Sequence, residues 1–407
     1  MKENNRDYFE LKIREALEEF KQGYKARDTK VVDQFIDKLF DKNDKTAVLG
    51  TSFGEWMMGL AGAKEIVESD WQYWGDVDIN TEDVDITTFD GTAFVNVKGT
   101  VRYEFEYTDE KFDGYLKFVK HFFDSSDQDY KMSAKVKAGQ IGFVLTHFNQ
   151  IRKEGKREYF YPLRINAVMM MQGDRAVFRF MKFSMDSYSQ YPELRIDNQM
   201  MDMNEYYEQQ QSFVEVCKKE NRPEAKEILD SFMKFIKEGF NRDTKEVDEI
   251  SQYFSSSKCN YVIDTKGNIN RDKAAWETLQ NLKHTWQKLA VDEKAVYSDV
   301  SGTTAWIVCN GLASRTINEQ EGAEVLMANI QKLVDMDVAT KEKLFSVQKQ
   351  VADYFLQYAK GEYFLWPIRI AAMFIKENGQ WKLYGMNFSY PFYYILEGKY
   401  DAAIEIE

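Results

Sequence analysis

The chain has 407 residues, too many for one typical hydrophobic core, and its 44% hydrophobic and 15% aromatic residues exclude a disordered chain. Its formal net charge of -13 repels phosphate backbones and no basic patch offsets it, so no nucleic-acid partner is expected. No apolar run is long enough to span a membrane, and no signal peptide follows the first methionine. Because three widely spaced cysteines fit a reducing compartment, we expect a soluble cytoplasmic protein.

The first expected element is an amphipathic helix, which a short helix around Glu55–Trp74 and a half-buried strand follow. In the strand, apolar positions 101, 103, 105 and 107 alternate with polar residues. A helical stretch over Asp113–Arg152 comes next, and two long strands joined by a turn at Gly173-Asp174 close the series. The apolar face of the first helix is formed by Phe9, Ile13, Leu17, Phe20 and Tyr24.

The same series is expected again after a polar segment over 199–220. An amphipathic helix begins after Pro223, a residue that the first helical turn tolerates. A short helix over Lys273–Leu289, strands and a helical stretch over Glu321–Lys360 follow, and Asn378-Gly379 predicts a tight hairpin between the last two strands. The apolar face of the first helix in this series is formed by Ile228, Phe232, Phe235 and Phe240.

Four blocks of sequence recur in the same order in the two series. Residues 21–33 match 237–248 when one residue is dropped, Trp71-Gln72 matches Trp286-Gln287, and 90–95 resemble 301–307. The fourth block contains a Pro-x-Arg strand, at 158–165 and 362–370, and the same step leads from each Pro to a Phe-Ser pair. We therefore interpret the chain as one α+β domain written twice, with copy one at 1–198, a linker at 199–220 and copy two at 221–407.

Each copy resembles the nuclear transport factor 2-like superfamily, and copy one is most similar to its SnoaL-like branch. The resemblance covers most of each copy. Copy two departs from the pattern, with Lys273-Ala274-Ala275-Trp276 in place of a Glu-Trp pair and with Thr285 in place of Asp70. The residues that carry the resemblance in copy one are Gly50-Thr51, Glu55-Trp56, Gly59, Asp70-Trp71 and Trp74-Gly75.

The resemblance implies two tandem cone-shaped domains, each with helices packed on a strongly bent antiparallel sheet and with a helical insertion before the last strands. It also implies a cavity between helices and sheet, and pairing through the sheets. Two copies in one chain can form that pairing internally, as a pseudo-dimer. Because the superfamily includes isomerases, dehydratases, cyclases and binding modules without activity, the fold does not decide the function.

Aromatic residues are the first candidates for a ligand site. Their rings either line a cavity for a flat or lipophilic ligand or fill the core, and core burial is the more common role. The candidates are Trp56, Trp71 and Trp74 in copy one and Trp276 and Trp286 in copy two.

Two matched arginines, Arg164 and Arg369, are further candidates, because a guanidinium on the inner face of a sheet can hold a substrate carboxylate. The alternative, which we favour, is that each one pairs with a neighbouring carboxylate such as Glu104. The Met-rich strand 168–171 is expected to be buried on both sides at the interface between the copies.

Asp70 and Asp186 are the candidate general bases in copy one, with Tyr188 as a nearby proton donor. A carboxylate beside aromatic rings has its pKa raised by desolvation, which favours proton abstraction near neutral pH. Solvated or capping roles are the more common alternative. No metal-ligand spacing and no glycine-rich phosphate loop occurs, so no metal and no cofactor is expected.

The sequence favours a module that binds a small apolar or amphiphilic molecule, mainly in copy one. Its motivation is that aromatic residues recur in both copies while candidate acids and bases do not. A cofactor-free isomerase or lyase with a carboxylate base is the alternative. A third possibility is a purely structural module, which would be favoured if side chains filled both cavities.

Overall fold

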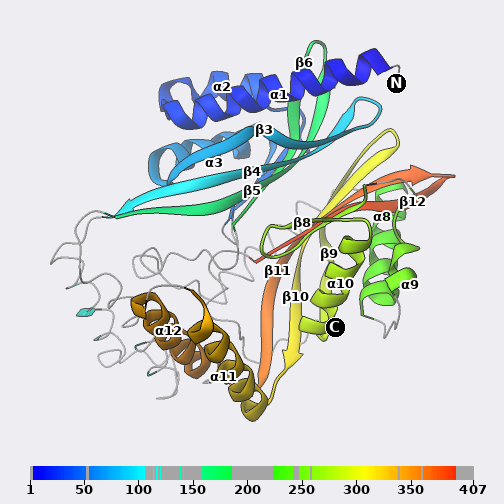
Figure 1. Cartoon of the computed structure of the whole chain (residues 1–407). Coiled ribbons are helices and arrows are strands. Elements are labelled where there is room, and N and C mark those ends of the chain that lie inside the picture. Colours follow the sequence, from blue (N-terminus) through cyan, green and yellow to red (C-terminus); the bar gives the residue numbers. More distant parts are fainter. Residues whose placement is uncertain are drawn as a thin grey trace.

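The computed structural model describes residues 3–51, 55–105, 157–185, 223–241, 247–256, 259–337, 340–358 and 361–390, and single helical positions between 113 and 141. Two six-stranded sheets and two groups of helices make up these residues, which confirms the α+β class. Figure 1 shows the sheets of the two copies next to each other, with α1 to α3 on one outer side and α8 to α10 on the other. No helix in the described ranges is long and apolar enough to span a membrane.

In copy one, three helices cover one face of the sheet. Their apolar residues face inward because they recur at helical spacing, and Phe9, Ile13, Leu17 and Phe20 are almost completely buried, as predicted. The elements are α1 (Glu3–Ala26), η1 (Thr29–Val31), α2 (Val32–Leu39), β1 (Ala47–Leu49), β2 (Trp56–Met58), α3 (Gly59–Tyr73), β3 (Asp76–Thr88), β4 (Thr92–Phe105), β5 (Arg157–Gln172) and β6 (Arg175–Met185).

Copy two repeats this series and adds a described helical hairpin, α11 and α12, where the sequence predicted a helical insertion. The corresponding insertion of copy one, predicted over Asp113–Arg152, lies largely outside the described residues. The elements are α8 (Pro223–Lys234), η2 (Phe235–Phe240), α9 (Val247–Ser251), β7 (Tyr261–Ile263), β8 (Ile269–Arg271), α10 (Lys273–Thr285), β9 (Lys288–Ser301), β10 (Thr304–Thr316), α11 (Glu319–Asp335), α12 (Thr340–Tyr358), β11 (Tyr363–Glu377) and β12 (Gln380–Ser389).

The two sheets have the same strand order and the same irregularities. The orders are β2-β1-β6-β5-β4-β3 and β8-β7-β12-β11-β10-β9. A register shift in the pairing of β3 with β4 has its counterpart between β9 and β10, and Gly99 and Gly311 sit beside these shifts, where an added Cβ would meet a backbone oxygen at 2.6 Å. Because bulges bend strands, they give both sheets the same bend, and the repeat inferred from the sequence is present in the fold.

Each sheet uses one face for its own core and the other for the second copy. Along β5, Met169 belongs to the core of copy one, whereas Val168 and Met170 pack into a cluster shared by both sheets. The predicted burial of this strand on both sides is therefore confirmed. The shared cluster includes Leu49, Phe94, Val168 and Phe180 from copy one and Tyr261, Trp306, Met373 and Tyr384 from copy two.

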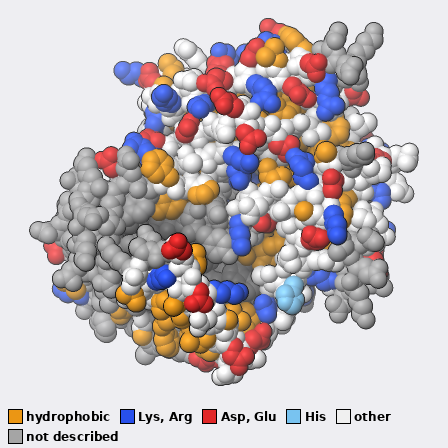
Figure 2. Space-filling model, viewed as in Figure 1, with side chains coloured by type: hydrophobic (Ala, Val, Ile, Leu, Met, Phe, Trp, Pro, Cys, Tyr) orange, Lys and Arg blue, Asp and Glu red, His pale blue; other side chains and the backbone are white. Residues whose placement is uncertain are grey.

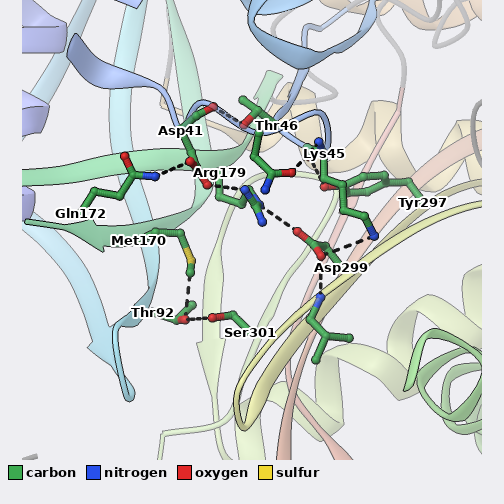
Figure 3. Close-up of polar contacts among 12 residues, drawn as sticks. Asp41, Lys45, Thr46, Thr92, Met170, Gln172, Arg179, Tyr297, Asp299 and Ser301 are labelled. Carbon is green, nitrogen blue, oxygen red and sulfur yellow. Dashed lines mark hydrogen bonds and ion pairs between the residues drawn. The ribbon is translucent and has the colours of Figure 1, made fainter. Parts of the chain in front are cut away.

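Charged residues add a polar network to this interface (Figure 3). The Arg179 guanidinium lies between the carboxylates of Asp41 in copy one and Asp299 in copy two, with 2.8 Å from Nε to Asp299 Oδ2. Thr92 donates to Ser301 across the same boundary at 3.0 Å. Two sheets joined by an apolar cluster and a buried ionic network fit the expected internal pseudo-dimer.

The helical hairpin of copy two lies apart from the other helices. Figure 1 places α11 and α12 away from α8 to α10, and Figure 2 shows hydrophobic surface over this part of the molecule. No residue of α11 is buried. The exposed large apolar residues of the hairpin and the turn that joins its helices are Val325, Met327, Val334, Met336, Leu344 and Phe355.

Candidate functional site

A tyrosine and an aspartate meet inside copy one, near the C-terminal ends of α1 and α3. The hydroxyl of Tyr24 donates to Oδ2 of Asp70 at 2.8 Å. Tyr24 is only 3% exposed, and it lies on the apolar face of α1 that the sequence predicted to be buried. The apolar spacing of α1 therefore positions a polar group in the core, with Asp70 as its partner.

Arg27 fixes the end of α3 that carries Asp70. Its backbone is left-handed, with φ of 50°, and its side chain crosses to α3. There it donates to three backbone oxygens, those of Asp70 at 2.8 Å, Trp71 at 2.9 Å and Trp74 at 2.6 Å. The backbone N–H of Trp74 already donates to the carbonyl of Asp70, and the carbonyls that follow at a helix end lack partners within the helix. The guanidinium satisfies these carbonyls and holds Asp70 in place.

The environment of Asp70 disfavours its charged form. Burial raises the pKa of the Asp70 carboxyl well above its usual range, and the negative charge of Glu55 raises it further. The hydrogen bond from Tyr24 and the positive charge of Arg27 oppose this rise. Burial also raises the pKa of the Tyr24 hydroxyl, as does the charge of Asp70. The pair therefore holds its proton to a higher pH than a solvated carboxylate does.

Tyr24 lies in an aromatic cluster with Trp71 and Phe183, and copy two has aromatic rings at the three matching positions. Tyr24 contacts Trp71 at 6.2 Å and Phe183 at 6.3 Å between ring centroids. In copy two, Phe240 contacts Trp286 at 6.2 Å and Phe388 at 6.3 Å. The polar pair is absent from this cluster, because Phe240 has no hydroxyl and Thr285 replaces Asp70.

The indole nitrogens of the two matched tryptophans also differ. Trp286 is completely buried and donates from Nε1 to the hydroxyl of Tyr390 at 3.1 Å. Trp71 is 5% exposed, and its Nε1 is buried without a hydrogen-bond partner among the described residues. Met185 occupies the position that Tyr390 has in copy two, directly after the matched Phe-Ser pair. A buried N–H group normally has a partner, so Trp71 offers a donor inside copy one.

The other predicted aromatic residues have separate places. Trp74 is half-buried against the core of copy one, with its ring 5.9 Å from Phe183. Trp276 packs against Phe254 in copy two, with centroids 4.3 Å apart. The sequence predicts a helix around Glu55–Trp74, but Trp56 lies in β2, before α3 begins, and packs into the cluster between the sheets. Asp186 and Tyr188 lie outside the described residues.

The two predicted arginines point away from the cores of their own copies and reach the opposite copy. Arg369 donates to the backbone oxygen of Gly50 at 2.6 Å, and its guanidinium lies 5.5 Å from the ring centre of Trp56. Arg164 donates from Nε to the backbone oxygen of Gly267 at 2.5 Å. These oxygens belong to corresponding turns, between β1 and β2 and between β7 and β8. The matched arginines thus act reciprocally across the pseudo-dimer.

Sequence reasoning missed the roles of Tyr24 and Arg27. Tyr24 was assigned only to an apolar helix face, although the repeat alignment places it opposite Phe240 and Asp70 opposite Thr285. That joint difference was the available signal. The contacts of Arg27 with α3 have no signal in the sequence. Among the described residues, no group of three His, Cys, Asp or Glu side chains is arranged to hold a metal ion.

No family model and no curated protein matches the sequence. Solved structures similar to parts of the chain include a proposed dehydratase of the nuclear transport factor 2-like family from Streptomyces avermitilis, with 9% identity, a TM-score of 0.27 and coverage of 40% of this chain and 94% of that one. A nuclear transport factor 2-like superfamily protein from Salmonella enterica has 9% identity and a TM-score of 0.25, and the match covers 44% of this chain and 90% of that one. A nuclear transport factor 2-like protein of unknown function from Pseudomonas putida has 9% identity and a TM-score of 0.25. The match covers 41% of this chain and 85% of that one. Each neighbour covers less than half of this chain, and likenesses at these TM-scores carry no argument about its family or its activity.

Proposed function

We propose that copy one binds a small, largely apolar molecule that carries an oxygen acceptor, and that copy two serves as its scaffold. The observation that carries the proposal is that the matching ring clusters of the two copies have different polar groups beside them. In copy two, the hydroxyl of Tyr390 accepts the hydrogen bond from the indole N–H of Trp286. Copy one has Met185 there and adds the Tyr24–Asp70 pair. We also propose that the protein is cytoplasmic and that residues 199–220 form the linker between the two copies.

The chemistry of the proposed ligand follows from these groups. Trp71 and the surrounding rings offer an apolar wall, and the indole N–H offers a donor to a carbonyl or hydroxyl oxygen. The Tyr24–Asp70 pair offers both a donor and an acceptor, because it can hold a proton. A site built to hydrogen-bond an oxygen discriminates strongly against analogues that lack it, since the buried groups are then left unpaired.

The test is a thermal-shift screen of small cyclic ketones and alcohols, followed by calorimetry on the compounds that stabilise the chain. We expect Tyr24→Phe and Trp71→Phe to weaken binding by roughly tenfold, the effect of one lost hydrogen bond. Thr285→Val, at the position of copy two that matches Asp70, is the control and leaves the affinity unchanged. A screen without a stabilising compound, or equal binding by Tyr24→Phe, contradicts the proposal.

A second candidate function is a cofactor-free isomerase or lyase in which Asp70 is the general base. The raised pKa of Asp70 beside a tyrosine hydroxyl favours it, because a carboxylate with a raised pKa is a stronger base than a solvated one and accepts a proton more readily. Deuterium uptake at the carbon next to the carbonyl of a bound ketone, measured by mass spectrometry in heavy water, tests it. Uptake that Asp70→Asn abolishes supports catalysis, and binding without uptake leaves the binding module alone.

A further inference from the structure

A polar groove opens at one end of the interface between the copies. It has a volume of about 560 Å³ and is lined from both copies. Arg164 faces it, half-buried, with its Nε on the backbone oxygen of Gly267. The remaining lining residues are Asp83, Val84, Asp85, Asn96 and Lys98 of copy one and Asn268, Ile269 and Arg271 of copy two.

At the corresponding end of the pseudo-dimer, which we call the closed end, the described residues bury the matched arginine. There Arg369 is only 2% exposed, with Trp56 beside its guanidinium. Tyr297 and Val308 are buried in the same apolar cluster between the sheets. Matched arginines therefore stand at both ends, one buried beside Trp56 and the other facing a groove.

Strand register identifies the residue changes that make the difference. Ile269 pairs with Ile263 as Trp56 pairs with Leu49, so an isoleucine stands where the closed end has a tryptophan. Asp85 pairs with Asn96 as Tyr297 pairs with Val308, so a carboxylate and an amide replace an aromatic and an aliphatic side chain. These replacements remove volume and add polar groups at the same place.

We propose that this groove binds a small organic anion, with a carboxylate or phosphate group directed at Lys98, Arg164 and Arg271. Three cations and two carboxylates line the groove, in a chain whose net charge is -13. The two carboxylates also orient the cations. Lys98 lies 3.1 Å from Asp83, and Arg271 of copy two forms an ion pair with Asp85 of copy one.

The amide and apolar side chains that line the groove indicate what the rest of the ligand is like. Asn96 is 3% exposed and donates to Asp85 at 3.1 Å, so its orientation is fixed. Val84 and Ile269 offer a small apolar surface between the charged groups. The groove therefore suits an anion with a short carbon body, and it is separate from the Tyr24–Asp70 pair. Because it spans both copies, its ligand would link them.

Calorimetry with inorganic phosphate and with succinate, at constant ionic strength in a buffer without either group, tests the proposal. We expect wild type to bind one of the two at one site, and Lys98→Gln to weaken binding by roughly tenfold through the loss of one charge-assisted hydrogen bond. Lys237→Gln is the matched control, because Lys237 is also an exposed lysine in one ion pair, with Glu293 at 2.7 Å. It leaves binding unchanged.

Ile269→Trp is the second variant, because it introduces the side chain that the closed end carries. We expect it to abolish binding while the thermal unfolding midpoint stays near that of wild type. Binding of phosphate alone assigns a phosphate ester to the groove, and binding of succinate assigns a carboxylate. Absence of binding by both, equal weakening in Lys237→Gln, or unchanged binding in Ile269→Trp overturns the proposal.

Discussion

The interiors of the two copies are built around the same three rings, and they differ in the polar atoms that accompany them. In copy two, the indole of Trp286 has its acceptor in Tyr390, and uncharged Phe240 and Thr285 stand at the positions of Tyr24 and Asp70. In copy one, Tyr24 and Asp70 place a hydroxyl and a carboxyl against the rings, and Trp71 keeps a buried donor without a described acceptor. A duplicated fold can thus keep the same ring packing in both copies while the polar groups described beside the rings differ.

The largest expected effect tests whether the rings are equally important to stability. Trp286→Ala deletes a fully buried side chain and should lower the free energy of unfolding by about 3–5 kcal/mol, the usual cost of such a deletion. Trp71→Ala should cost about 1 kcal/mol less, because no hydrogen bond to a described residue is lost with the ring. Urea unfolding followed by circular dichroism measures both. An equal or larger cost for Trp71→Ala would show that the two interiors are energetically alike.

The next effect concerns the charge of Asp70. Its pKa in the folded chain is raised by burial above the unfolded value of about 3.9, so the folded state binds the proton more tightly. That contribution is fully present below the unfolded pKa and is lost as pH rises through the folded pKa. Asp70→Asn removes this loss. The stability of the variant relative to wild type should therefore rise with pH above about 4, by about 1.4 kcal/mol for each pH unit by which the folded pKa exceeds the unfolded one.

Asp76 provides a control of opposite sign on the adjacent strand. Hydrogen bonds from Arg102 and Arg27 lower the pKa of its carboxyl, so its contribution to stability is present above the unfolded pKa and is lost as pH falls. Asp76→Asn should become less stable than wild type as pH rises, and only slightly, because Asp76 is exposed and its ion pairs are screened by solvent. Parallel slopes for the two variants would mean that burial does not govern Asp70.

Much of the fold could be predicted from the sequence because the patterns that indicate its helices and strands occur in both copies. The amphipathic spacing of the first helices, the Pro-x-Arg strands and the hairpin at Asn378-Gly379 lie where the pattern placed them. The three-residue strands β1, β2, β7 and β8 were not predicted. They are too short for alternation to show, and they exist because each sheet supplies a strand to pair with.

The candidate site was predicted only in part. Asp70 and Trp71 were identified from a motif, and the structure places them beside one another in a buried ring cluster. Arg164 and Arg369 were placed on the inner face of a sheet, but a strand pattern that is apolar on both sides does not say which face is which. Their partners are backbone oxygens of the opposite copy, which no local pattern in the sequence encodes.

A further expected effect isolates the acceptor that distinguishes copy two. Tyr390→Phe keeps the ring and removes the hydroxyl, so the N–H of Trp286 stays buried without this acceptor, at a cost of about 1–3 kcal/mol. Met185→Leu, at the matched position of copy one, changes only the shape of an apolar group and should cost less than about 1.5 kcal/mol. Hydrogen exchange at the indole N–H of Trp286, followed by nuclear magnetic resonance, should speed up in Tyr390→Phe and stay unchanged in Met185→Leu. Unchanged exchange in Tyr390→Phe would mean that water replaces the hydroxyl, and that the interiors differ less than their side chains indicate.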